Sequence, residues 1–135
     1  MSTEPNSEKR SLLAQLIKFI QVDNEISAEE FGLLSRIAAQ LKVSKFELSD
    51  MFKEQIKFHP PKQEFERIVQ FHRFVLLMNI DGIINEEELY FIKNAAIKLG
   101  LNPKATNEVL VKMHNYPNKL IPTNILLQIF TQHFN

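Results

Sequence analysis

The sequence has no cysteine and no tryptophan, and only three of its 135 residues are glycine. Without cysteine, the chain cannot form disulfide bonds, thiol nucleophiles or thiolate metal sites. Lys and Arg together number 16, as do Asp and Glu, so the formal net charge is zero. No overall field therefore attracts the chain to a polyanion, and we expect no nucleic-acid partner. The sequence leaves open a peripheral contact between the protein and a membrane surface.

Long apolar runs are also missing. The longest, from Phe74 to Met78, is far shorter than a membrane span. The first ten residues are polar and lack the apolar stretch of a secretory signal. We therefore expect a cytoplasmic protein. The hydrophobic fraction of 44% suits one globular domain, which we place at residues 9–135 after a flexible N-terminus at residues 1–8.

The pattern of apolar residues predicts an all-α fold. They recur at spacings of three and four, the period of amphipathic helices, and no segment alternates as a strand does. The first such stripe consists of Leu12, Leu13, Leu16, Ile17 and Ile20. A second stripe begins at Phe65 and becomes almost wholly apolar by Met78, so we expect this helix at the centre of the core.

An internal similarity links two parts of the chain. A shift of 58 positions places residues 16–44 on residues 74–102 without a gap. The identical pairs are Asp23/Asp81, Ile26/Ile84, Glu29/Glu87, Glu30/Glu88, Ala38/Ala96 and Leu41/Leu99. We interpret them as a duplicated helix–Asp turn–helix unit. With the remaining helix starts, this unit predicts a bundle of roughly seven helices.

Capping residues mark where the helices begin. A cap followed three residues later by glutamate occurs at Ser27 and Glu30, at Asn85 and Glu88, and at Ser44 and Glu47. Gly100 is placed to end a helix in the left-handed conformation, and Asn102-Pro103 is a typical helix start. The two helices that follow are expected at about residues 103–114 and 123–134.

The two acidic turns supply the candidate site. Asp23 and Asp81 each lie where a helix should end, facing the unfavourable negative end of its dipole. Each aspartate either accepts backbone amides in its own turn or binds a cation with a glutamate seven residues later. The second reading gives Asp23, Glu30, Asp81 and Glu88 as metal ligands for Ca²⁺ or Mn²⁺, with Glu29 and Glu87 nearby.

A calcium-binding EF-hand is not expected at either turn. Residues 81–88 match only the second half of that loop, and Leu77 stands where its first aspartate should be. A weak site for a hard divalent cation stays open.

Residues 22–30 and 80–88 resemble the repeated acidic turn of TerB-like domains. That family includes the tellurite-resistance TerB proteins and the membrane-proximal domain of DjlA co-chaperones. The resemblance implies a compact bundle of about seven helices in a bacterial cytoplasm and a role in stress response. It also implies an acidic metal-binding patch at the four positions named above. The family is not a recognised enzyme class.

We therefore expect a non-enzymatic TerB-like binding module that acts through contacts with a protein partner and a weakly held divalent cation. Two alternatives stay open, a small metal-dependent hydrolase that uses the same acids and a purely structural adaptor. The four histidines are scattered and none belongs to an HExxH motif, which argues against the hydrolase. Residues 23–30 and residues 81–88 each carry four acids and no base, which is either ordinary variation of the surface or a docking face for a basic partner.

Overall fold

The fold is known from a computed structural model that describes residues 4–22, 25–82 and 84–133. These residues form seven α-helices and two short 3-10 helices, with no strand among them, which confirms the all-α prediction. The α-helices are α1 (Glu4–Ile20), α2 (Ala28–Gln40), α3 (Lys45–Met51), α4 (Glu64–Asn79), α5 (Glu86–Lys98), α6 (Pro103–Lys112) and α7 (Thr123–Gln132). The 3-10 helices are η1 (Met113–Asn115) and η2 (Pro117–Lys119).

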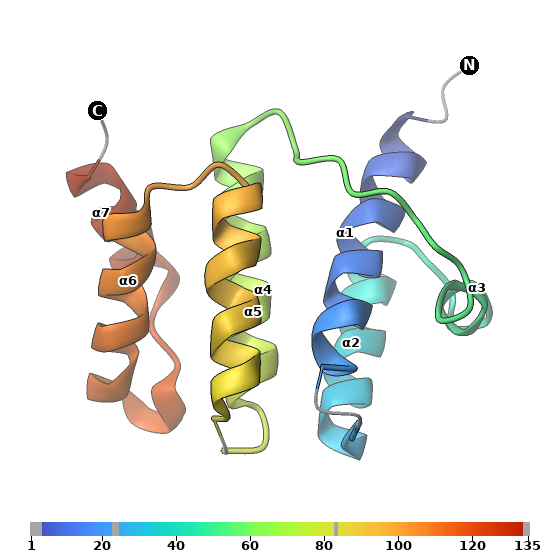
Figure 1. The fold of residues 1–135 in the computed structure, drawn as a ribbon, viewed down its shortest axis with the longest axis horizontal. Helices are drawn as coiled ribbons and strands as arrows, with labels where there is room; N and C mark the ends of the chain where they lie inside the picture. Colours follow the sequence, from blue (N-terminus) through green and yellow to red (C-terminus); the bar gives the residue numbers. More distant parts are fainter. Residues whose placement is uncertain (1–3, 23–24, 83, 134–135) are drawn as a thin grey trace.

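Two antiparallel hairpins form most of the bundle. Helices α1 and α2 make the first and α4 and α5 the second, and α1 contacts both helices of the second hairpin. Both hairpins turn at the same end of the molecule (Figure 1). Helices α6 and α7 pack together beside α5, and α3 lies next to α2.

Helix α4 forms the centre of the core, as its sequence predicts. Its side chains Phe71, Phe74, Val75, Leu77 and Met78 are fully buried. Neighbours α1, α2 and α5 all pack against this helix, so it has little surface left for a polar face. Because other helices surround α4, its second half is almost wholly apolar.

The first helix begins earlier than the sequence indicates. We placed the start of the domain at residue 9, whereas α1 starts at Glu4. Residues 4–10 are mostly polar, so they show no apolar period by which a helix could be recognised. At the end of this stretch, Arg10 forms an ion pair with Glu54 at 2.7 Å.

The predicted caps are present. The Ser27 hydroxyl accepts a hydrogen bond from the Glu30 N–H, and the Glu30 carboxylate accepts one from the Ser27 N–H, both at 3.0 Å. Ser44 and Glu47 form the same capping box. The side chain of Asn85 accepts from the Glu88 N–H at 2.7 Å, which caps α5. These bonds satisfy amides that have no partner within the helix. Whether the two hairpins arose by duplication stays a prediction.

Helices α2 and α5 end in the same backbone motif. Gly100 adopts φ +75°, and the Leu101 N–H donates to the Ala96 carbonyl at 3.1 Å. Fifty-eight residues earlier, Lys42 adopts φ +63°, and the Val43 N–H donates to Ala38 at 2.8 Å. The left-handed conformation costs a residue with a Cβ roughly 1–2 kcal/mol. Lys42 therefore carries strain that Gly100 avoids.

We predict that Lys42→Gly stabilises the fold by about 1 kcal/mol, because it relieves this strain. Gly100→Ala should destabilise by about the same amount, since a Cβ there meets no atom within 4 Å and its cost is that of the backbone alone. Urea denaturation of both variants measures the two changes. Opposite signs are the expected result, and a destabilised Lys42→Gly variant would contradict the strain argument.

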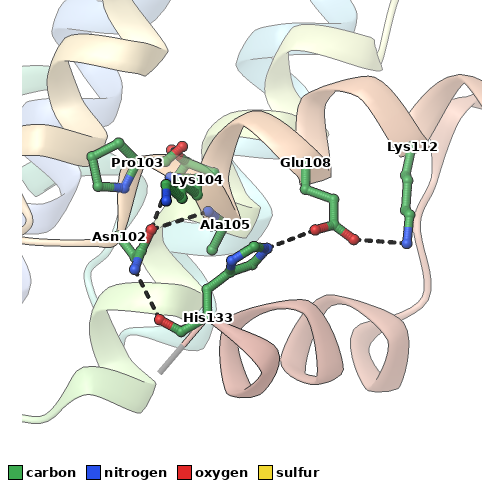
Figure 2. A network of polar contacts seen from close by, with 8 residues as sticks. Asn102, Pro103, Lys104, Ala105, Glu108, Lys112 and His133 are labelled. Atoms are coloured by element: carbon green, nitrogen blue, oxygen red, sulfur yellow. Dashed lines mark hydrogen bonds and ion pairs between the residues drawn. The ribbon is translucent and has the colours of Figure 1, made fainter. Parts of the chain in front are cut away.

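Polar contacts join the last two long helices (Figure 2). Asn102 caps α6 by accepting from the N–H groups of Lys104 and Ala105, and its amide donates to the His133 carbonyl at 2.8 Å. The Glu108 carboxylate lies 2.7 Å from both His133 Nε2 and Lys112 Nζ. Hydrogen bonds lower the pKa of Glu108, and the bond from Lys112 has a larger effect than the bond from His133.

The predicted ends of these helices differ slightly from those observed. Helix α6 ends at Lys112 and continues as the 3-10 helix η1, where the sequence predicted helix up to residue 114. Helix α7 ends at Gln132, and residue 134 of its predicted range lies outside the described residues. Differences of one or two residues are usual where a helix end tightens into 3-10 geometry.

Helix α4 also holds the segment that links α6 to α7. The Asn79 amide donates to the Lys119 carbonyl at 3.2 Å. His72 forms a hydrogen bond with the backbone of Ile121. Burial lowers the pKa of His72 below its ordinary value of 6.5. The hydrogen bond to Ile121 opposes this shift, and the positive charge of Arg73 adds to it.

This lowered pKa predicts that acid weakens the fold through His72. Well above pH 6.5, His72 is neutral in both the folded and the unfolded chain, and its contribution to stability is complete. Below that pH the unfolded chain takes up the proton first, so stability falls until the folded histidine also protonates. Urea denaturation between pH 7.5 and about pH 5 should show a shallower decline for His72→Gln than for the wild type. Parallel pH profiles would contradict the assignment to His72.

Candidate functional site

The described residues include three of the four predicted ligands. Residue Asp23 lies outside them, whereas Glu30 and Glu88 are buried and Asp81 is exposed. No group of three or more His, Cys, Asp or Glu side chains that could hold a metal ion occurs among the described residues. The pairing of each aspartate with the glutamate seven residues later stays a prediction.

Glu30 and Glu88 have a role in helix initiation. Each is the third residue of its helix, and their exposed fractions are only 3% and 4%. Glu30 completes a capping box, and both carboxylates lie near the positive end of a helix dipole. The neighbouring Glu29 and Glu87 are exposed. A divalent cation at the turns stays a prediction from the sequence.

We predict that Glu30→Ala destabilises the fold by about 1 kcal/mol, because the Ser27 N–H loses its acceptor. Glu30→Gln should retain most of that stability, since an amide oxygen can accept the same hydrogen bond. Urea denaturation measures both changes, and Glu47→Gln in the exposed second capping box is the matched control. Equal losses for Glu30→Ala and Glu30→Gln would show that the charge matters more than the cap.

A hollow in the described part of the chain lies elsewhere, between α1 and α5. It is a groove of about 670 Å³ that we call the α1–α5 groove. Its lining comes from α1 and Val22 just after it, from the segment between α3 and α4, and from α5. The lining residues are Ser11, Gln15, Lys18, Val22, Ile56, Phe58, Glu86, Glu87, Tyr90, Phe91, Asn94, Ala95 and Lys98.

Hydrogen bonds hold the α1 side of the groove in place. The Ser11 hydroxyl accepts from the His59 N–H at 2.8 Å, which fixes the neighbouring Phe58 against α1. The Gln15 side chain accepts from Gln70 Nε2 of α4 at 3.0 Å. Gln70 is fully buried and also donates to the Leu12 carbonyl at 3.1 Å. Because these polar groups are paired, this wall is preorganised.

Aromatic contacts hold the α5 side. The ring of Phe91 lies 5.6 Å from that of Phe19 in α1 and 5.9 Å from that of Phe74 in α4, measured between centroids. Phe91 is thus both part of the groove lining and attached to the core. Its neighbour Tyr90 lines the groove but is 73% exposed. A large aromatic side chain left open beside an apolar groove is typical of a contact surface.

The groove was not predicted from the sequence. Its lining residues are separated by up to 87 positions, from Ser11 to Lys98, and only folding brings them together. One signal was available in α5, where Leu89, Tyr90, Phe91 and Ile92 form an unbroken apolar or aromatic run. Four such residues exceed one helical turn, so they indicate either a helix that is buried all round or an apolar side chain at the surface, and Tyr90 is the second case.

A second hollow of about 410 Å³ lies between α5 and α6, around Leu89, Lys93, Leu110 and Val111. It is smaller than the α1–α5 groove, and it contains none of the predicted acidic ligands.

Comparison with protein-family models, with curated proteins and with solved structures finds no match. The TerB-like resemblance therefore stays a prediction from the two turns. Among the described residues, no helix is both long and apolar enough to cross a membrane.

Proposed function

We propose that this domain is a non-enzymatic binding module that takes a segment of a partner protein into the α1–α5 groove. The observation that carries the proposal is the groove itself, about 670 Å³ in volume and lined from three separate segments of the chain. The proposal retains the class of function implied by the TerB-like resemblance. It moves the contact surface from the acidic turns to α1 and α5.

The chemistry of the lining supports binding by contact. Its apolar part consists of Val22, Ile56, Phe58, Phe91 and Ala95, with Tyr90 at the open side. The rest of the lining consists of serine, amide, lysine and glutamate side chains, and it contains neither histidine nor cysteine. Protein interfaces likewise combine apolar and polar side chains.

The metal-based alternatives from the sequence require a different site. A weak cation site or a hydrolase centre would need Asp81 and Glu88, and the groove lining includes neither of them. If the turns bind a cation, Ca²⁺ or Mn²⁺ raises the melting temperature of the wild type more than that of an Asp81→Ala, Glu88→Ala variant. Equal responses would remove both alternatives. Hydrolysis of generic phosphoesters with added Mn²⁺ separates the hydrolase from simple binding.

We predict that Tyr90→Arg abolishes partner binding while the domain stays folded. Tyr90 is 73% exposed, so the substitution should change stability little, but it places a charged and bulky side chain at the groove. The measurement is quantitative affinity capture from an extract of the source cells with immobilised wild type and variant. For each protein that binds the groove, the amount captured by Tyr90→Arg should be at least tenfold lower than the amount captured by the wild type.

The matched control is Phe46→Arg. Phe46 is an aromatic residue of α3 that is 82% exposed and does not line the groove. Capture by this variant should equal capture by the wild type. If the wild type, Tyr90→Arg and Phe46→Arg retain the same proteins in the same amounts, the groove is not the binding surface.

A further inference from the structure

Residues 55–60 lie between α3 and α4 without regular secondary structure, and we call this segment the strap. It runs past α1 on its way from α3 to α4 (Figure 1). Both ends of the strap are anchored. Before it, the Glu54 N–H donates to the Met51 carbonyl of α3 at 3.2 Å. After it, Pro61 is buried and its carbonyl accepts from Arg67 of α4 at 3.4 Å.

The backbone of the strap is held at a single point between these anchors. The His59 N–H donates to the Ser11 hydroxyl of α1 at 2.8 Å. The other N–H groups of residues 55–59 have no hydrogen bond to another described residue. Segments with so few backbone hydrogen bonds open at a lower free energy than the core does. The contact between Ser11 and His59 is therefore the one whose loss frees the backbone of the strap.

Two apolar side chains of the strap form the third wall of the α1–α5 groove. Ile56 and Phe58 are partly buried, pack against the core and line the groove. The residues between and beside them are exposed, which is the alternation of an extended segment with one side against the protein. Ser11 also lines the groove, yet only 1% of this residue is exposed. If the strap moves away from α1, the groove loses this wall and Ser11 is uncovered.

We propose that the strap is a movable wall of the α1–α5 groove and that the hydrogen bond between the Ser11 hydroxyl and the His59 N–H is its latch. When the latch is closed, Ile56 and Phe58 restrict the groove. When it is open, the strap moves outward while both of its anchors stay attached, and the groove becomes larger. As a control on the size of the proposed binding surface, this inference rests on the proposed function. The movement itself is a property of the chain alone.

Cleavage by trypsin after Lys57 measures how often the strap opens. Lys57 lies in the middle of the strap, and its cleavage requires that this part of the chain first leaves the fold. Below the unfolding transition, the rate in the wild type should be nearly independent of urea, because opening of the strap exposes little surface. Ser11→Ala should raise the rate about fivefold, the change expected for the loss of one hydrogen bond.

Ser35→Ala is the matched control for this substitution. Ser35 lies in α2, and its hydroxyl has no hydrogen-bond partner among the described residues. Both substitutions place alanine, the better helix former, in a helix that stays folded when the strap opens, so this effect on the opening cancels. The rate of cleavage after Lys57 in Ser35→Ala should equal the rate in the wild type.

Thiol labelling tests whether the opening uncovers the groove. The chain has no cysteine, so Ser11→Cys and Ala95→Cys each carry a single thiol. Positions 11 and 95 are 1% and 3% exposed and line the α1 and α5 sides of the groove, but only position 11 is bonded to the strap. Iodoacetamide without urea should label Ser11→Cys at least tenfold faster than Ala95→Cys. Labelling of Ala95→Cys should rise with urea as global unfolding does.

Three results would overturn the inference. Cleavage after Lys57 that rises with urea as steeply as global unfolding would mean that the strap does not move on its own. Equal cleavage of the wild type and Ser11→Ala would mean that Ser11 is not the latch. Equal labelling of the two cysteine variants would mean that the opening does not reach the groove. None of these measurements uses a partner, so capture by the wild type and Tyr90→Arg still decides the proposed function separately.

Discussion

The contact among Phe19, Phe74 and Phe91 is the interaction on which the bundle and its groove both depend. One ring comes from each of α1, α4 and α5, and the centroids lie 5.5 to 5.9 Å apart. The Phe19 and Phe74 rings meet edge to face, a favourable arrangement for aromatic side chains. Because this cluster joins the first hairpin to the second, it sets the separation of α1 and α5. The same separation defines the width of the groove.

A buried polar contact complements the aromatic cluster. Gln70 of α4 donates to both Gln15 and the Leu12 carbonyl of α1, and accepts from Arg73 at 3.0 Å. Apolar packing alone would tolerate a helix sliding by one turn, whereas these directed bonds are satisfied in one register only. The rings therefore set how far apart the helices lie, and Gln70 fixes the alignment of α4 with α1. Together they hold the α1 wall of the groove in one position.

Local features of the fold could be predicted from the sequence, whereas of the long-range ones only the central position of α4 could. The caps at Ser27 and Ser44 and the helix end at Gly100 depend on residues within one turn, so short motifs identify them. The central position of α4 followed from its apolar run. The groove depends instead on Ser11, Phe58 and Phe91 meeting in space, and no local pattern encodes that meeting. A cation site was predicted at the acidic turns, which repeat in the sequence. Two similar helix starts, however, also produce a repeat of this kind.

The glutamates at the start of α5 show how one short run can have several roles. Glu88 is buried at the third position of the helix, where its N–H is capped by Asn85. Glu86 and Glu87 are exposed and line the α1–α5 groove. The positive end of the α5 dipole favours all three carboxylates, so the acidic character that helps the helix begin also gives one end of the groove its charge. The same acidic residues make the turn resemble a metal site and give one end of the groove a negative charge. Both features have one cause, which is that acidic residues stabilise the start of a helix after a tight turn. A partner that bound this end of the groove would contact charges that also serve folding.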